Sequence, residues 1–491
     1  NPLVYVDVTY KVGASRELPG QSGFAHFFEH LMFEGTQNLS KSQFYKMLPE
    51  AYSNFNGATY SDFTRYYELI PKNYLETALW MEADRMLNIG NSITLEKLNL
   101  QRKIVINEKY EKSLNVPYGI IDELVNQKLY PKNHPYAWPT IGYIKDLKAA
   151  TVDDMKLFFY KWSSPNNAII TISGDVKSEE VVQFVTKYFA SIPKGEELEK
   201  LKKFNQTILS EDKVIDYADN VRYNLVRKVF PTVEAWHKDE PALDALSYIF
   251  NQLNTRNSKT KKYEAPLNID VSHPCKELSG TFVVDSWSSC LDINKTLVTS
   301  LKTIQKAGLD AEDLAEFKEF KKKNFYSILE DITNKGLQLS SYEFYNNSPD
   351  GIKKDWDRYM QVNTTNLQQV FDTYVNGKPA VILNVKPYEV SKDEYYDRST
   401  KTTDSDTNRH IDLIEKRLSL INTITAAPKP SVSNMANFAA TNYWTSTFSG
   451  NIKLIGTDNN NSPITYIQLR LKAGAAFYPK KPGMPNILAG I

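Results

Sequence analysis

Two histidines and a glutamate stand within five residues of the sequence, at His26, Glu29 and His30. In a helix, a spacing of four residues places both imidazoles on one face, one turn apart, which suits two ligands of a tetrahedral metal site. Only six histidines occur in 491 residues, so this pattern arises by chance in roughly one such sequence in a few hundred. A chance alignment on a buried face would leave three polar groups to satisfy. The spacing therefore predicts a metal site.

The motif needs a helix to present it and a further element to complete it. We expect a helix over 23–34, anchored in the core by its other apolar face (Phe27, Phe28, Leu31 and Met32). Two histidines leave a zinc site short of ligands, so a third group must come from elsewhere, with the fourth position left for water. An expected helix over 95–111 offers Glu108 and Glu111. Both residues qualify on chemistry, and the residues alone do not choose between them.

Such a centre has a definite chemistry. A metal ion lowers the pKa of bound water and polarises a carbonyl, while a neighbouring carboxylate accepts the proton and returns it to a leaving amine. Glu29 lies beside the two histidines and is the candidate base. The motif thus predicts hydrolysis of an amide bond.

Composition excludes several other classes of protein. The 59 Lys and Arg residues balance 58 Asp and Glu residues, for a net charge of +1, so nucleic acid and anionic membranes are not expected partners. No apolar run approaches the 18 or so residues of a membrane span. With 41% hydrophobic and 24% charged residues, the chain is globular, and its length suggests about three domains.

The order of expected elements divides the chain. Residues 1–195 alternate strands with amphipathic helices, and residues 205–390 form a second region of the same kind. Residues 391–440 are polar and are expected to be a hinge. Residues 441–491 begin a repeat, because Tyr466–Gly474 matches Tyr5–Gly13. The abrupt ends of the chain indicate a piece of something longer, and the positions matching the motif in the later copy, Asn486, Ala489 and Gly490, cannot hold zinc.

Several stretches in the right order carry a resemblance to a known family: Gly23–Thr36, Thr64–Glu68, Glu82–Met86, His134–Gly142 and Ser164–Ala168. The chain resembles the pitrilysin (insulinase-like) zinc peptidases, of the bacterial type with two homologous halves in one chain, here truncated within the second half. The resemblance implies an α+β fold of layered, antiparallel-rich sheets with packed helices, in repeated domains like those of mitochondrial processing peptidases.

The family also assigns roles to residues of this chain. It implies one Zn²⁺ held by His26, His30 and Glu108, with Glu29 as general base, the inverzincin arrangement. Family members usually carry a glutamate seven residues before the third ligand, where this chain has Gln101; the change removes a carboxylate that would orient a ligand. The resemblance also places Asn56, Gly57, Ala58 and Thr59 on an edge strand that pairs with extended substrate.

These roles imply a zinc metalloendopeptidase that cuts peptides or unfolded polypeptide segments inside a chamber closed by the second half, which binds but does not catalyse. Resemblance to secreted bacterial forms favours the periplasm. The alternative is a catalytically weak or inactive peptide-binding or scaffold member, or a fragment that needs its second half.

Overall fold

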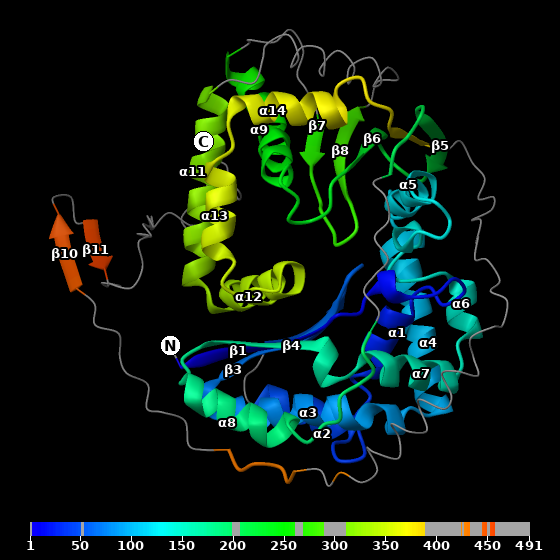
Figure 1. Ribbon diagram of the computed structural model, residues 1–491, viewed down its shortest axis with the longest axis vertical. Helices are drawn as coiled ribbons and strands as arrows, with labels where there is room; N and C mark the ends of the chain where they lie inside the picture. Colours follow the sequence, from blue (N-terminus) through cyan, green and yellow to red (C-terminus); the bar gives the residue numbers. More distant parts are fainter. Residues whose placement is uncertain are drawn as a thin grey trace, which may run out of the picture. The chain divides into compact units, whose positions relative to one another are not determined.

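The computed structural model describes residues 2–50, 54–198, 207–260, 269–288, 311–387, 424, 427–432, 444–448 and 452–456. The chain divides into two compact units, Asn1–Asn437 and Phe438–Ile491. The first unit contains two β-sheets with helices packed against them (Figure 1).

The first sheet has four strands in the order β2-β3-β1-β4, and every neighbouring pair is antiparallel. Its strands are β1 (Leu3–Tyr10), β2 (Asn54–Thr59), β3 (Thr64–Pro71) and β4 (Ala168–Gly174). Strand β1 pairs on both sides, whereas β2 has one neighbour, β3, among the described strands. In the described part of the chain the other edge of β2 is therefore unpaired, and such an edge can accept another strand.

The same part of the chain contains the helices α1 (Phe24–Leu31), α2 (Lys41–Glu50), α3 (Leu75–Ser92), α4 (Leu95–Lys109), α5 (Ile121–Leu129), α6 (Ile144–Ala149), α7 (Val152–Trp162) and α8 (Ser178–Phe189). Of these, α5 packs against two strands of the second sheet, Lys213–Asp219 and Val381–Pro387. Helix α4 ends before the predicted boundary at residue 111, and the chain continues as a π-helical turn, Tyr110–Leu114. In that turn Glu111 is exposed.

Both faces of the first sheet are covered. Helix α3 packs against β1 and β3, and Figure 1 shows α12 (Ile332–Asn346) on the opposite face, against β1 and β4. The Ser340 hydroxyl donates to Thr9 Oγ1 at 3.0 Å, and a Cβ at Gly336 would lie 2.4 Å from the Tyr5 ring. A helix from the second predicted region thus covers the polar face of β1.

The second sheet has five strands in the order β5-β9-β6-β8-β7. It consists of β5 (Lys213–Asp219), β6 (Asn224–Thr232), β7 (Ile269–Ser272), β8 (Gly280–Ser288) and β9 (Val381–Pro387), with only β5 and β9 parallel among the described pairs. Its core is closed by α9 (Glu240–Thr260), α11 (Ala311–Glu330), α13 (Ile352–Met360) and α14 (Thr364–Val370).

The predicted fold class is confirmed: antiparallel-rich sheets carry packed helices. The two sheets fall within the predicted ranges 1–195 and 205–390, although the domain boundaries themselves stay predictions. In the second unit, β10 (Trp444–Phe448) pairs antiparallel with β11 (Ile452–Gly456). The repeat at 466–474 and the positions Asn486, Ala489 and Gly490 lie outside the described residues. No helix in the described part of the chain has the length and apolarity of a membrane span.

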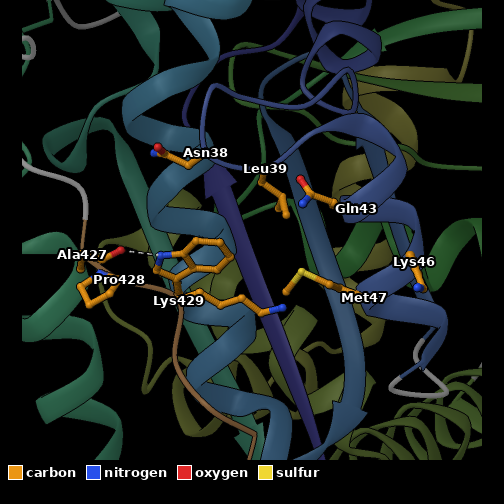
Figure 2. Close-up of a pocket in the computed structure, with 9 residues that line it drawn as sticks. Asn38, Leu39, Gln43, Lys46, Met47, Ala427, Pro428 and Lys429 are labelled. Atoms are coloured by element: carbon orange, nitrogen blue, oxygen red, sulfur yellow. Dashed lines mark hydrogen bonds between the residues drawn. The ribbon is translucent and has the colours of Figure 1, made fainter.

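A short part of the predicted hinge region contacts the first sheet's helical layer. The indole Nε1 of Trp80 on α3 donates to the carbonyl oxygen of Ala427 at 2.9 Å. The dashed line that ends at Ala427 in Figure 2 marks this hydrogen bond. Pro428 and Lys429 continue along a cavity of about 460 Å³, which is also lined by Asn38, Leu39, Gln43, Lys46 and Met47. Residues 427–432 are therefore attached to α3 by a specific hydrogen bond.

Candidate metal centre

Helix α1 carries the two histidines, and its start requires glycine. Gly23 precedes the helix with φ of 85°, and a Cβ there would lie 2.7 Å from the Gly142 Cα. The backbone N–H groups of Gly23 and Ala25 donate to the Glu17 carboxylate at 2.9 and 2.8 Å. Glu17 thus satisfies donors that the first helical turn leaves without partners. The apolar face behaves as predicted: Phe27, Phe28, Leu31 and Met32 are buried.

Three candidate ligands converge between α1 and α4. The Nε2 atoms of His26 and His30 lie 3.7 and 3.1 Å from Oε2 of Glu108. One ligand atom from each residue falls within 4.8 Å of the others, so in the described part of the chain these three side chains form a group that could hold a metal ion. Their side chains are 13–20% exposed, so the site is shielded but reachable from solvent.

The charges at this centre match what a metal needs. The hydrogen bond from His30, aided by Lys112, lowers the pKa of Glu108 to about 2, so this carboxylate is charged at neutral pH. Burial, then the neighbouring His30, lowers the pKa of His26 to about 4, which leaves its ring neutral. Burial acts to lower the pKa of His30, but the hydrogen bond to Glu108 outweighs it and raises that pKa. A bound cation would replace the proton that Glu108 and His30 share.

Glu29 lies on the same helix and is held by β2. Its Oε2 accepts a hydrogen bond of 2.6 Å from Thr59 Oγ1. A Cβ on Gly57 would lie 2.9 Å from Glu29 Oε1, so glycine leaves the room that the carboxylate occupies. Burial raises the pKa of Glu29, and the Thr59 hydrogen bond opposes that rise. The strand thus fixes one oxygen of Glu29 and makes space for the other.

Gln101 lies behind His30. The Nδ1 atom of His30 is 3.2 Å from Gln101 Oε1, and the amide Nε2 of Gln101 donates to Glu34 Oε1 at 2.5 Å. Gln101 and Glu34 are 4% and 6% exposed. The sequence predicted that a carboxylate is lost at position 101. In the structure the Glu34 carboxylate lies on the far side of Gln101 and contacts His30 through the Gln101 amide.

The predicted substrate strand forms the edge of the first sheet. Asn56 is exposed, Gly57 is buried, and Ala58 and Thr59 are partly buried. The Gly57 N–H donates to the side-chain oxygen of Asn56 at 2.9 Å, while the N–H of Tyr60, three residues on, donates to the Phe63 carbonyl at 2.8 Å. Because ladder hydrogen bonds alternate along a strand, the Gly57 N–H belongs to the free edge of β2.

Three residues near the candidate centre were not predicted from the sequence. Lys112 donates to Glu108 Oε1 at 2.6 Å, and Glu34 and Glu17 act as described above. The spacing of Glu108 and Lys112 by four residues was a visible signal of an ion pair. Nothing local marked Glu34 or Glu17, because each acts on residues that only the fold brings near.

Comparisons with known proteins identify the family that this chain resembles. Residues 1–138 match the family described as Insulinase (Peptidase family M16), and residues 149–320 match the Peptidase M16 inactive domain. The chain is 26% identical over 403 residues to the zinc protease PqqE of Helicobacter pylori, a match that spans 78% of this chain and 88% of that protein. The first match contains all three candidate ligands and Glu29.

Solved structures share the fold. A protease from Helicobacter pylori superposes with a TM-score of 0.71 at 24% identity, over 79% of this chain and 94% of that one. The periplasmic protease PqqL of Escherichia coli gives a TM-score of 0.68 at 15% identity, over 94% of this chain and 54% of that one. The chain therefore spans about half the length of PqqL.

Proposed function

The chain belongs to the insulinase-like (M16) peptidase family, and from this premise we propose that it is a zinc-dependent endopeptidase acting on peptides or unfolded polypeptide segments. The observation that carries the proposal is the convergence of His26, His30 and Glu108 beside Glu29. Relatives named zinc proteases support it.

The donor set fits zinc. Two imidazole nitrogens and one carboxylate oxygen are the ligand types of catalytic zinc sites, which keep one position open. His26 Nδ1 is buried and has no hydrogen-bond partner among the described residues, so no hydrogen bond at this nitrogen orients the ring. A bound zinc ion would supply Lewis acidity, making water more acidic and polarising a peptide carbonyl.

Glu29 performs the proton transfers in this proposal. Its carboxylate takes a proton from water as the water attacks the scissile carbonyl, and then gives that proton to the departing amine. A carboxylate with a raised pKa suits this task because it must hold the proton between the two steps. Thr59 limits the directions in which the carboxylate can turn.

The free edge of β2 is the proposed substrate site. An extended peptide would add as a strand, with main-chain hydrogen bonds supplying affinity independent of sequence. Asn56 covers the outward N–H of Gly57, so its side chain would move aside when substrate pairs there. Such pairing requires an unstructured substrate, because a folded one has no free backbone to offer.

A second half completes the proposed enzyme. The match to the whole of PqqL, of which this chain covers 54%, supports a two-half protein in which the other half closes a chamber. PqqL is named a periplasmic protease, and we propose the same compartment for this protein. Cleavage should rise when the other half is supplied in trans, and an unchanged rate would contradict the chamber.

The test combines metal content with cleavage. We expect the purified protein to hold one zinc per chain and to cleave an unstructured fluorogenic peptide. The Glu29→Gln variant should keep zinc but lose cleavage, because the amide cannot accept the proton. Equal cleavage by both proteins would show that Glu29 is not the base, and absence of zinc from both would contradict the metal assignment.

A second candidate is a non-catalytic peptide-binding role. The match of residues 149–320 to the Peptidase M16 inactive domain fits this alternative, although that range excludes the four residues of the centre. In this case Glu29→Gln would bind peptide as tightly as the wild type, and neither protein would cleave it.

A further inference from the structure

A buried chain of polar side chains runs from the surface to His30. Lys41 forms an ion pair with Oε1 of Glu34, and the same oxygen accepts the amide N–H of Gln101. The other end of that amide, Oε1, lies 3.2 Å from His30 Nδ1. The links come from three places in the chain: Glu34 follows α1, Lys41 begins α2, and Gln101 lies on α4.

The chemistry of Glu34 decides which way the Gln101 amide points. An ionised carboxylate only accepts hydrogen bonds, whereas an amide donates at one end and accepts at the other. The ion pair with Lys41 marks Glu34 as the charged form. The NH₂ end of Gln101 must therefore face Glu34, and its oxygen must face His30.

The orientation of the Gln101 amide in turn decides which nitrogen of the neutral His30 ring carries the hydrogen. An oxygen beside Nδ1 requires that this nitrogen carry a hydrogen. The lone pair of the neutral ring then belongs to Nε2, the atom that lies 3.1 Å from Glu108 Oε2 within the ligand group. A metal ligand needs this tautomer, because a protonated nitrogen cannot bind a cation.

We propose that Glu34 is a positioning residue of the metal centre: acting through Gln101, it fixes the tautomer and ring orientation of His30. The inference rests on the proposed function, since it treats His30 as a ligand. It also accounts for the neutral residue at position 101. Glu34 carries the negative charge and contacts His30 only through Gln101. The Gln101 amide therefore orients the His30 ring as a carboxylate at position 101 would do directly.

If Glu34 only stabilised the local fold, substitutions of Glu34 and Lys41 would have the same effect on zinc binding. If its role were to hold Lys41 and the loop that follows α1, then breaking the ion pair from either side would have the same effect. Lys41 is 44% exposed, and its removal leaves the hydrogen bond between Glu34 and Gln101 in place. Lys41→Met is therefore the matched control for Glu34→Gln.

The experiment measures zinc affinity by competition with a chelator in the full chain. We expect Glu34→Gln to weaken zinc binding by about tenfold, the lower end of the range for residues that hydrogen-bond to a metal ligand. A glutamine at position 34 can either accept or donate a hydrogen bond, so the Gln101 amide can turn over and present its NH₂ group to His30. Lys41→Met should bind zinc nearly as the wild type does. The exchanged pair Glu34→Gln with Gln101→Glu should recover most of the affinity, since a carboxylate again faces Nδ1.

The outcomes separate the two proposals. If Glu34→Gln binds zinc as the wild type does, or if Lys41→Met weakens binding equally, Glu34 is not a positioning residue, and the zinc site still stands. If the wild type and Glu108→Gln bind zinc equally poorly, the metal centre is wrong and this inference falls with it. Failure of the exchanged pair to recover affinity that Glu34→Gln lost would also overturn the relay.

Discussion

Thr59 Oγ1 donates a hydrogen bond of 2.6 Å to Oε2 of Glu29. The two residues are thirty positions apart, on β2 and α1, and this bond joins the edge strand to the candidate base. The sequence placed Thr59 among the substrate-binding residues. Its side chain instead contacts Glu29, so we predict that it acts on the rate of the chemical step.

Thr59→Val keeps the branched shape and removes the hydroxyl. We expect kcat to fall by about tenfold, equivalent to about 1.4 kcal/mol, with little change in KM, because Glu29 loses the partner that orients it. Thr59→Ser retains a donor and should stay closer to the wild type. Steady-state kinetics on one peptide check this, and a raised KM at constant kcat would return Thr59 to a substrate contact.

The choice between Glu108 and Glu111 gives a second prediction. Glu108→Gln should weaken zinc binding by about 100-fold or more. Substituting a direct ligand lowers zinc affinity more than substituting a residue that only hydrogen-bonds to a ligand. Glu111→Gln should bind zinc as the wild type does, since Glu111 is exposed in the π-helical turn. Lys112→Met controls for the ion pair lost in Glu108→Gln. If Glu111→Gln weakened zinc binding more than Glu108→Gln, Glu111 and not Glu108 would be the third ligand.

His134 predicts how stability depends on pH. Its Nδ1 accepts the Tyr136 N–H at 3.1 Å, which requires that nitrogen to be unprotonated, and its ring stacks on Tyr130. Burial, then Lys276, lowers the pKa of His134 to about 4, from 6.5 in the unfolded chain. Between these values the unfolded chain binds more protons, so this residue's contribution is complete above pH 6.5 and is lost as the pH falls toward 4.

The matched variant is His134→Asn, which keeps an acceptor at the same position and does not titrate there. The wild type should lose more unfolding free energy than the variant between pH 7 and pH 5, by at most about 1.4 kcal/mol per pH unit. Chemical denaturation of the metal-free proteins at both pH values measures it. Parallel losses in the two proteins would contradict the assignment.

Trp80 provides a prediction outside the metal centre. Trp80→Phe keeps a ring on α3 but removes the N–H that binds the Ala427 carbonyl. We expect faster hydrogen exchange at the backbone N–H groups of Ala427, Lys429, Ser431 and Val432, and a loss of about 1 kcal/mol in stability. Trp356→Phe, at a tryptophan that packs against Phe325, is the control. Unchanged exchange in Trp80→Phe would show that the hydrogen bond does not hold this segment.

Local patterns were enough to identify the elements and half of the centre. The spacing of His26 and His30 places both on one helical face whatever surrounds them, because a helix has a fixed period. The apolar face of α1 likewise predicted a helix anchored in the core, which the structure contains.

Contacts between distant segments decided the rest. Sequence periodicity could not choose Glu108 over Glu111, because the choice depends on how α4 packs against α1 and on the π-helical turn after Lys109. Asp7 and Thr9 alternate with valines as solvent-facing residues would, yet α12, more than 300 residues later, buries them. Glu34 shows the same limit, since a side chain acquires its role from partners that only tertiary packing brings within hydrogen-bonding distance.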